Sequence, residues 1–418
     1  MRTKIEISKL AKIESASIYL DDFLLFVGDN NSGKTLLMEL LYGIIDLVSK
    51  WKNNCNKARI TEQDNVKYIQ FANDWFRNVE DELNRYLHVN KEQFVLNSFF
   101  SSIPLESVQI KFEDTEELFY IGAISEQVSL EKQYPNGERE TIFEETYVSD
   151  NIEDELAHKV LLDMIGIHGN EKQLFVPAAR AGLQMLYRYF FVTSGSVNPG
   201  MPLAVFEYLK FMQTYATRNV FSENEKELLD FLEQKVIKGK VEFENNEFIF
   251  YEGENKIPLN YASSMIHEVS VLTSILKSNK QLKYIYYDEV ENSVHPLMQG
   301  KVASALIRLC NLGKRIIIST HSDTMAGKIN NLLLLSKMKN MGEKRKKISK
   351  IGLTVSDMLM DNKTVMVYEF KKDNDDKVRV EPLEFMEYPQ IGYCFERFNE
   401  NIDQLYNESN FIMEDDEN

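Results

Sequence analysis

The segment from Gly28 to Thr35 has the residue types and spacing of a loop that binds phosphate. It fits the pattern G-x-x-x-x-G-K-[ST] at every fixed position, between an apolar strand-like run and a helix-like run. The two glycines let the backbone curl until successive N–H groups point at an anion. The lysine would reach the β- and γ-phosphates, and the threonine hydroxyl would bind Mg²⁺ where the helix begins. The expected nucleotide-binding residues are Gly28, Asp29, Asn30, Asn31, Ser32, Gly33, Lys34 and Thr35.

A second candidate group lies far downstream, in the sequence KYIYYDEVENSVHP from Lys283 to Pro296. A β-rich apolar run in this stretch ends in Asp288 and Glu289. An Asp at the carboxyl end of a buried parallel strand would lie at the same edge of the sheet as the phosphate loop. Asp288 would then hold Mg²⁺ through water, and Glu289 would orient or deprotonate the attacking water. Alone, an acidic pair after a strand usually forms a solvated turn, so the hydrolytic interpretation depends on the phosphate loop.

Both groups need a sheet to bring them together, and the surrounding patterns predict one. Residues 4–27 give strand-like runs, and residues 35–50 have apolar residues at the three- and four-residue steps of an amphipathic helix. Residues 51–100 are polar and predicted to be mostly helical, whereas residues 107–147 alternate as strands around a Pro135-Asn136-Gly137 turn. Further helices are expected at 151–167, 202–219, 223–236, 261–278, 297–312 and 394–407, and further strands at 240–259, 284–287, 315–319, 363–371 and 377–383.

Length and composition narrow the class of protein. The 418 residues are enough for two or three domains, and no run is apolar enough for a signal peptide or a membrane helix. The net charge of −17 argues against wholesale wrapping of nucleic acid, although a basic run at 344–350 would form either a solvated loop or a contact to nucleic acid or a partner. The cysteines, Cys55, Cys310 and Cys394, are too scattered for a disulfide framework or a zinc site. We therefore expect a cytoplasmic protein.

Five segments occur in an order that is typical of one family. They are KIEISKLAKIESASIYLDDFLLFVGDNNSGKT, FVPAAR, IPLNYASSMIHEVSVL, IYYDEVENSVHP and IIISTHSDTMAGKINNLL. This order resembles the ABC-type ATPases allied to RecF, the structural-maintenance-of-chromosomes (SMC) heads and the overcoming-lysogenization-defect nucleases. It is most similar to the stand-alone ATPases of bacterial anti-phage defence loci, such as PARIS-type systems. The resemblance implies an α/β P-loop NTPase of ABC-ATPase type, with a mixed central sheet, an antiparallel β subdomain and a helical insertion.

The resemblance also implies site residues, with ATP and Mg²⁺ as cofactors. The Walker A motif falls on residues 28–35, the Walker B aspartate on Asp288 and the catalytic glutamate on Glu289. His321 takes the place of the switch histidine that contacts the γ-phosphate or the attacking water; a lone histidine after a strand otherwise more often caps or fills a core. Ser263 would dock on the γ-phosphate held by a second protomer. Met265 stands where relatives keep a glycine, and its side chain would crowd that approach.

The expected organisation has four parts. Residues 1–50 and 171–340 would form the two parts of the ATPase domain, 51–170 a helical and antiparallel β insertion, and 341–418 a small α/β region. The favoured function is an ATP-dependent molecular switch that hydrolyses ATP slowly. It would be a homo-oligomer with composite ATP sites, and a sensor or scaffold of an anti-phage system that acts with a separate effector protein. The alternatives are a RecF-like DNA-binding repair ATPase, and an oligomeric scaffold with little hydrolysis.

Overall fold

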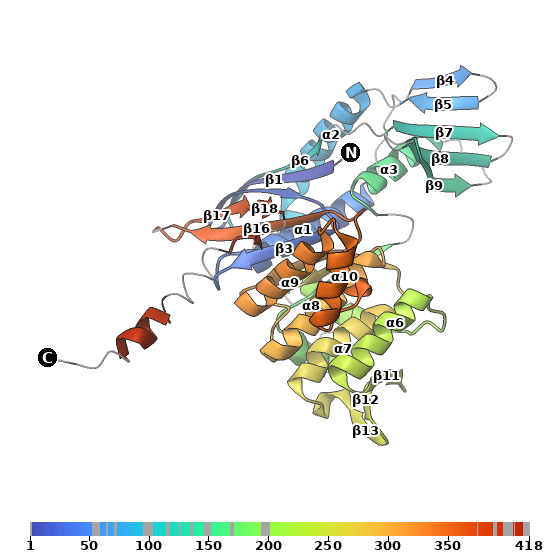
Figure 1. Ribbon diagram of the computed structural model, residues 1–418. Coiled ribbons are helices and arrows are strands. Elements are labelled where there is room, and N and C mark those ends of the chain that lie inside the picture. The colour runs from blue at the N-terminus through green and yellow to red at the C-terminus, as the bar shows by residue number, and fades with distance from the viewer. Residues whose placement is uncertain are drawn as a thin grey trace.

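The computed structural model describes residues 2–51, 59–63, 66–70, 73–94, 103–113, 118–124, 127–133, 137–145, 152–167, 171–193, 201–373, 375–387, 391–395, 404 and 406–412 (Figure 1). Within these residues, none of the helices combines the length and the apolar character needed to cross a bilayer. Cys310 and Cys394 are free thiols.

A nine-stranded mixed sheet forms the centre of the molecule, in the order β10-β14-β15-β3-β16-β17-β2-β1-β6. The strands from β10 to β16 run parallel to their neighbours, whereas β16–β17, β2–β1 and β1–β6 are antiparallel pairs. The bounds of these strands are β1 Arg2–Leu10, β2 Ile13–Tyr19, β3 Phe23–Gly28, β6 Leu105–Glu113, β10 Lys172–Val176, β14 Leu282–Tyr287, β15 Arg315–Thr320, β16 Val365–Lys372 and β17 Val378–Pro382.

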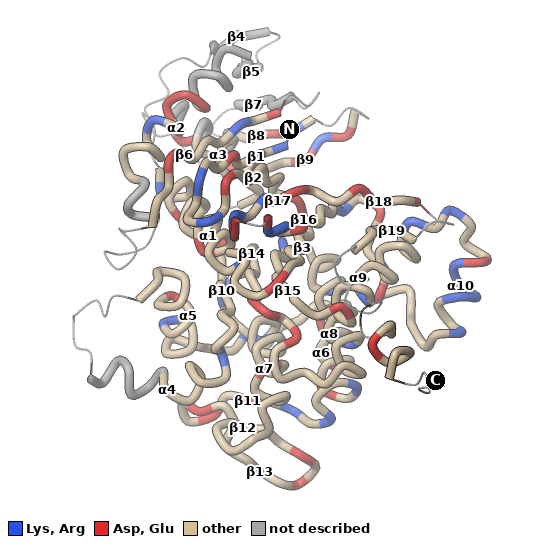
Figure 2. The backbone as a smooth tube through the Cα atoms, turned by 90° about the vertical axis from the view of Figure 1, so that its left-hand side faces the viewer, with Lys and Arg blue, Asp and Glu red and all other residues tan. Residues whose placement is uncertain are grey.

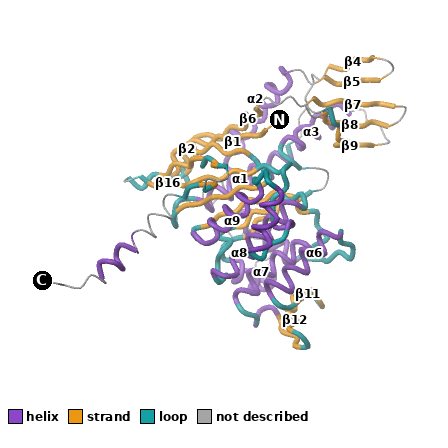
Figure 3. The backbone as a smooth tube through the Cα atoms, viewed as in Figure 1, coloured by secondary structure: helices purple, strands orange, loops and turns teal. Residues whose placement is uncertain are grey.

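Helices cover both faces of the parallel part of the sheet, and strand β3 is buried along its whole length. On one face, Leu24 and Phe26 of β3 pack in a core with α1. On the other face, Leu25 and Val27 pack with α7, α8 and α9. Figure 3 shows these helices in purple around the orange strands. The helices are α1 Lys34–Lys50, α2 Asn73–Phe94, α3 Ile152–Met164, α4 Arg180–Thr193, α5 Leu203–Gln213, α6 Glu223–Phe231, α7 Ser264–Lys277, α8 Pro296–Asn311, α9 Asp323–Ser336 and α10 Met341–Lys350.

Smaller antiparallel units lie at the periphery. The sheet β7-β8-β9 and the hairpin β4-β5 lie together at one end of the molecule, and β11-β12-β13 lies at the opposite end, next to α7 (Figure 1). A π-helix, Leu232–Ile237, continues α6. The strands are β4 Arg59–Gln63, β5 Val66–Gln70, β7 Leu118–Ile124, β8 Gln127–Gln133, β9 Arg139–Glu145, β11 Lys240–Glu244, β12 Glu247–Glu252, β13 Asn255–Pro258, β18 Phe385–Met386 and β19 Gly392–Tyr393.

The α/β class, the mixed sheet and the antiparallel subdomain are confirmed, with local corrections. The prediction that residues 51–100 are mostly helical is wrong for β4 and β5, which pair as a hairpin.

The basic run at 344–350 is not a loop, because it forms most of α10. Strand β10 and helix α4 were not predicted. Two residues of the expected turn, 135 and 136, and most of the expected helix at 394–407 lie outside the described residues. The four-part division stays a prediction, and the central sheet takes strands from each of the four parts.

Candidate phosphate-binding site

The loop between β3 and α1 has a backbone that its glycines make possible. Gly28 has a φ of 145°, and a Cβ there would lie 2.9 Å from the Cβ and the carbonyl oxygen of Phe370 on the neighbouring strand β16. Gly33, with a φ of 95°, precedes α1, and no side chain caps this helix. The N–H groups of the first turn of α1 are therefore available to an anion at the end of the helix where the dipole favours negative charge.

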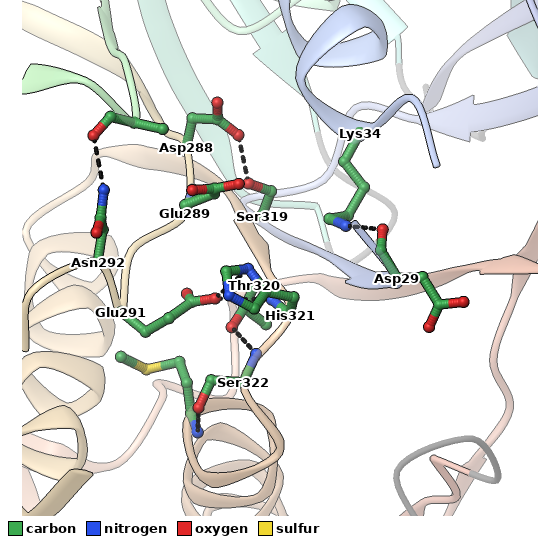
Figure 4. Close-up of polar contacts among 12 residues, drawn as sticks. Asp29, Lys34, Asp288, Glu289, Glu291, Asn292, Ser319, Thr320, His321 and Ser322 are labelled. Carbon is green, nitrogen blue, oxygen red and sulfur yellow. Dashed lines mark hydrogen bonds and ion pairs between the residues drawn. The ribbon is translucent and has the colours of Figure 1, made fainter. Parts of the chain in front are cut away.

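Lys34 brings a positive charge to this loop. Its ammonium group donates a hydrogen bond to the carbonyl oxygen of Gly28 (2.8 Å). It donates a second to the carbonyl oxygen of Asp29 (2.7 Å), which Figure 4 shows. Burial lowers the pKa of the ammonium group, and the surrounding carboxylates, that of Asp288 foremost, act in the opposite direction. A cavity of about 320 Å³ opens beside this loop and is lined by residues 10–12, 30–36 and Glu289.

Asp288 meets the phosphate loop directly. The hydroxyl of Thr35, in the first turn of α1, donates a hydrogen bond of 2.8 Å to Asp288 Oδ2, and the hydroxyl of Ser319 on β15 donates one of 2.5 Å to Oδ1. Strand β15 lies between β14 and β3, so the three parallel strands end side by side at this edge of the sheet. The structure thus brings together the two sequence segments that were expected to meet.

The carboxyl groups next to α1 lie in a weakly solvated environment. Burial raises the pKa of Asp288, and the hydrogen bonds from Ser319 and Thr35 oppose that rise. Burial also raises the pKa of Glu39, one helical turn after Thr35, to about 7, and the charge of Asp288 adds to this effect. Burial thus disfavours the ionised form of both carboxyl groups, and a cation bound beside them would favour it.

Glu289 follows Asp288 in an unusual backbone conformation. Its φ is 45°, in the left-handed region that residues with a side chain seldom adopt. Its N–H donates to the Ser319 hydroxyl (2.8 Å), and its side chain lines the cavity next to Lys34 and Thr35. The turn therefore directs consecutive acidic residues differently, with Asp288 against Thr35 and Glu289 toward the cavity.

His321 lies at the same edge of the sheet, just after β15, but its contacts are with Glu291. The backbone N–H of His321 donates to Glu291 Oε1 (2.7 Å), and its Nδ1 lies 3.0 Å from the same oxygen (Figure 4). Glu291 is buried, whereas the imidazole of His321 is 38% exposed. The histidine is thus held by a carboxylate on the side away from solvent, with part of its ring free to contact a ligand.

Ser263 is one of the expected site residues that do not line this cavity, together with Gly28, Asp29, Asp288 and His321. It is the N-cap residue of α7, its side chain is exposed, and it makes no capping hydrogen bond. Met265, in the first turn, is half-buried and packs against the core. The structure therefore places Ser263 on the surface, outside the phosphate-binding cavity of its own chain.

Three residues that contribute to the site were not recognised as site residues in the sequence. Ser319 orients Asp288, Glu39 adds a buried carboxyl group, and Arg180 donates hydrogen bonds to the carbonyl oxygens of Asp288 (2.7 Å) and Glu289 (3.0 Å). Ser319 and Glu39 gave little signal, because a serine after an apolar strand and a glutamate in an amphipathic helix are common. Arg180 is the last residue of the segment FVPAAR, in which a charged residue follows an apolar run, and this pattern could have drawn attention to it.

The residues present fit a magnesium ion held mainly by a nucleotide. In the part of the chain that the structure describes, no group of three or more His, Cys, Asp or Glu side chains could hold a metal ion. Mg²⁺ at triphosphate sites needs no such group, because it keeps several waters and takes one or two protein oxygens besides the phosphates. The hydroxyl of Thr35 and the carboxylate of Asp288 are hard oxygen donors of this type.

Part of the chain matches a known domain family. Residues 206–326 match the AAA ATPase domain family, and this segment contains Ser263, Asp288, Glu289 and His321. No curated protein matches the sequence.

Three solved structures are similar at low identity. An SMC head bound to the C-terminal winged-helix domain of ScpA is 12% identical, with 96% of this chain and 99% of that chain covered and a TM-score of 0.39. The SMC head domain from Thermotoga maritima is 10% identical, with 92% and 100% covered and a TM-score of 0.36. The ADP conformation of an ATP-binding cassette of an ABC transporter is 13% identical, with 79% of this chain and 85% of that chain covered and a TM-score of 0.34.

The chain has the α/β fold of a P-loop ATPase. Three features indicate this fold: the phosphate loop between β3 and α1, the acidic end of β14 and the matched domain.

Proposed function

We propose that this chain binds Mg·ATP at the phosphate-binding site and hydrolyses it slowly to ADP and phosphate. The observation that carries this proposal is the 2.8 Å hydrogen bond from Thr35 to Asp288, which joins the phosphate loop to the acidic end of β14. The loop N–H groups and Lys34 bind the β- and γ-phosphates. Thr35 and Asp288 would hold a magnesium ion, which would supply neutralisation of charge on the phosphate oxygens.

Glu289 is the residue that we assign to the attacking water. Its carboxylate accepts a proton as the water oxygen bonds to the γ-phosphorus, and the bond from that phosphorus to the β–γ bridging oxygen breaks. The ADP leaving group takes up the negative charge next to Lys34 and the N-terminus of α1. His321, held by Glu291, contacts the γ-phosphate or the same water. The position of Glu289 in the lining of the cavity supports this assignment.

The start of helix α7 would complete the ATP site of a second copy of the chain. Ser263 and Ser264 are exposed at the start of this helix, and the free N–H groups there would bind a phosphate presented by a second copy of the chain. A head-to-tail oligomer with two shared ATP sites follows. Met265 takes the position of a glycine that relatives keep, and a side chain there would hinder close backbone approach and slow turnover.

A role in anti-phage defence, as the sensor or scaffold of a separate effector protein, depends on the motif resemblance alone and stays a prediction. One observation favours the alternative of a DNA-binding repair ATPase. Helix α10 exposes Arg345, Lys346 and Lys350, and Figure 2 shows its blue, basic segments at the edge of the molecule. Basic side chains that neutralise phosphates would give binding that weakens steeply with salt.

The test is ATP turnover and molar mass of wild type, Glu289→Gln and Glu254→Gln, with and without Mg·ATP. Glu254 is exposed in the turn between β12 and β13, so its variant controls for loss of a carboxylate. We expect turnover that falls at least 100-fold in Glu289→Gln and is unchanged in Glu254→Gln. We also expect ATP to increase the molar mass, most strongly in Glu289→Gln.

Equal turnover in wild type and Glu289→Gln would refute the hydrolytic proposal, and a molar mass that ATP does not change would refute the composite sites. The affinity for duplex DNA, measured over a salt series, tests the alternative of a DNA-binding repair ATPase. This alternative requires tight binding that is lost when Arg345, Lys346 and Lys350 are changed to Glu.

A further inference from the structure

Arg180 is a charged residue that lies completely inside the protein. It is the first residue of α4 and has 0% exposure. One nitrogen of its guanidinium group, Nη1, donates to the carbonyl oxygens of Pro177 (3.2 Å) and Asp288 (2.7 Å), and Nη2 donates to the carbonyl oxygen of Glu289 (3.0 Å). The planar fork of an arginine suits two adjacent carbonyl groups, which a lysine ammonium could not satisfy in the same way.

These bonds hold the turn that carries Glu289. A φ of 45° is maintained only where the surrounding structure fixes it, and here the turn is fixed from two sides. Arg180 binds the carbonyl groups of residues 288 and 289, and the Ser319 hydroxyl accepts from the Glu289 N–H (2.8 Å). The direction of the Glu289 side chain into the cavity therefore depends on these contacts.

The other side of the guanidinium group binds helix α7. Arg180 Nε forms an ion pair with Glu268 Oε2, and Glu268 is 2% exposed. The backbone of the same residue accepts a hydrogen bond from the Tyr287 hydroxyl (2.6 Å), and the guanidinium carbon lies 4.6 Å from the centre of the Tyr287 ring. One side chain thus links the end of β14, the start of α4 and the first half of α7.

A buried ion pair is a poor choice for stability alone, because desolvation of both charges offsets their attraction. Apolar residues of similar volume would join α4 and α7 as well. What they could not do is donate to the carbonyl groups of residues 288 and 289. The contacts of Arg180 therefore suggest a role in the chemistry of the neighbouring site.

We propose that Arg180 is a positioning residue for hydrolysis, which holds Glu289 in its reactive direction and is itself held by Glu268 of α7. This proposal rests on the proposed ATPase function. The position of the general base and the position of α7 are set by the same guanidinium group, so a shift of α7 changes the alignment of Glu289. Nucleotide affinity does not depend on this contact, because the phosphate loop and Lys34 make no bond to Arg180.

The test compares Arg180→Lys, Glu268→Gln and Arg308→Lys with wild type. For each, kcat, KM, the affinity for a non-hydrolysable ATP analogue and the melting temperature are measured. Arg308 is a matched control, because it is also a buried arginine, 7% exposed, but pairs with Asp357 (2.9 Å) in another part of the fold.

We expect kcat to fall about 10- to 100-fold in Arg180→Lys, with analogue affinity within about threefold of wild type. Glu268→Gln keeps a hydrogen-bond acceptor for Arg180, so its kcat should fall less, by about 3- to 10-fold. Arg308→Lys should lower the melting temperature and leave kcat within about twofold of wild type.

If the wild type hydrolyses ATP and Arg180→Lys has the same kcat, this proposal is overturned. If Arg180→Lys does not fold, the same conclusion follows from an unchanged kcat in Glu268→Gln. Parallel losses of kcat, affinity and melting temperature would also overturn it, since they would show a structural role only. Turnover by wild type no faster than by Glu289→Gln would instead overturn the ATPase function, and this proposal with it.

Discussion

Four side chains from three separate parts of the chain make up the polar centre of the candidate site. Thr35 and Lys34 come from the start of α1, Asp288 from the end of β14 and Ser319 from the end of β15. The hydroxyl groups of Thr35 and Ser319 each donate to one oxygen of the Asp288 carboxylate, at 2.8 and 2.5 Å. A carboxylate that is oriented in this way needs little reorganisation to accept a metal ion, which is what a preorganised site requires.

Glu39 gives a pH-dependent stability that can be measured without nucleotide. Its pKa is raised from 4.5 to about 7, first by burial and then by the charge of Asp288. The folded protein therefore keeps a proton that the unfolded chain has lost, and stability declines as the pH rises through this range. At high pH, the ionised Glu39 should destabilise the fold by at most about 3 kcal/mol.

We expect Glu39→Gln to melt at a higher temperature than wild type at pH 8, by a few degrees, and near the wild-type temperature at pH 5. The measurement is a thermal melt at both pH values, without metal or nucleotide, beside Glu254→Gln as an exposed control. A difference between Glu39→Gln and wild type that is the same at both pH values would contradict this assignment.

Individual site residues could be predicted from the sequence best where a motif requires particular residue types. The phosphate loop was predictable because Gly28 and Gly33 are required by positive φ values and Lys34 by charge. Arg180 was not assigned a role, because its partners are backbone carbonyl groups of residues 288 and 289, and a backbone contact leaves no pattern of residue types.

Among the elements, α7 gives the sharpest prediction. An Asp is at least as good an N-cap residue as Ser, so Ser263→Asp should keep α7 stable. The same carboxylate would repel a phosphate brought to this helix by a second copy of the chain. We expect Ser263→Asp to lose the ATP-dependent increase in molar mass while its affinity for ATP stays within about threefold of wild type.

Light scattering and ATP titrations of Ser263→Asp and Asn340→Asp provide this test. Asn340 is the exposed N-cap residue of α10, so the control adds the same charge at an equivalent position of another helix. ATP-dependent association that survives in Ser263→Asp would exclude the start of α7 from the composite site.

Most elements were predictable from their periodicity, and the errors have identifiable causes. The runs RITEQ and VKYIQ of β4 and β5 are only five residues long, so their alternation was outweighed by the polar composition of the region. Helix α10 has few apolar residues, and its stability comes from an Asn340 cap and from Lys344, whose buried ammonium group donates to the Ser336 carbonyl oxygen (2.8 Å). Neither contact is visible as a repeat.

For the whole molecule, the central sheet ties the candidate site to distant parts of the chain. Strand β3, which leads into the phosphate loop, lies between β15 and β16, and β16 comes from residues 365–372. Gly28 packs directly against Phe370 of β16. The geometry of the loop therefore depends on the C-terminal part of the sheet, which local sequence patterns could not reveal because these strands pair across more than three hundred residues.

The most direct test of the central claim is the Mg²⁺ dependence of ATP binding in wild type, Lys34→Ala and Asp288→Asn. If the phosphate loop and the end of β14 hold one magnesium-bound triphosphate, Lys34→Ala should lose affinity about 100-fold with or without metal. Asp288→Asn should bind metal-free ATP like wild type but lose the gain in affinity that Mg²⁺ provides. Wild-type affinity and Mg²⁺ dependence in both variants would contradict the claim.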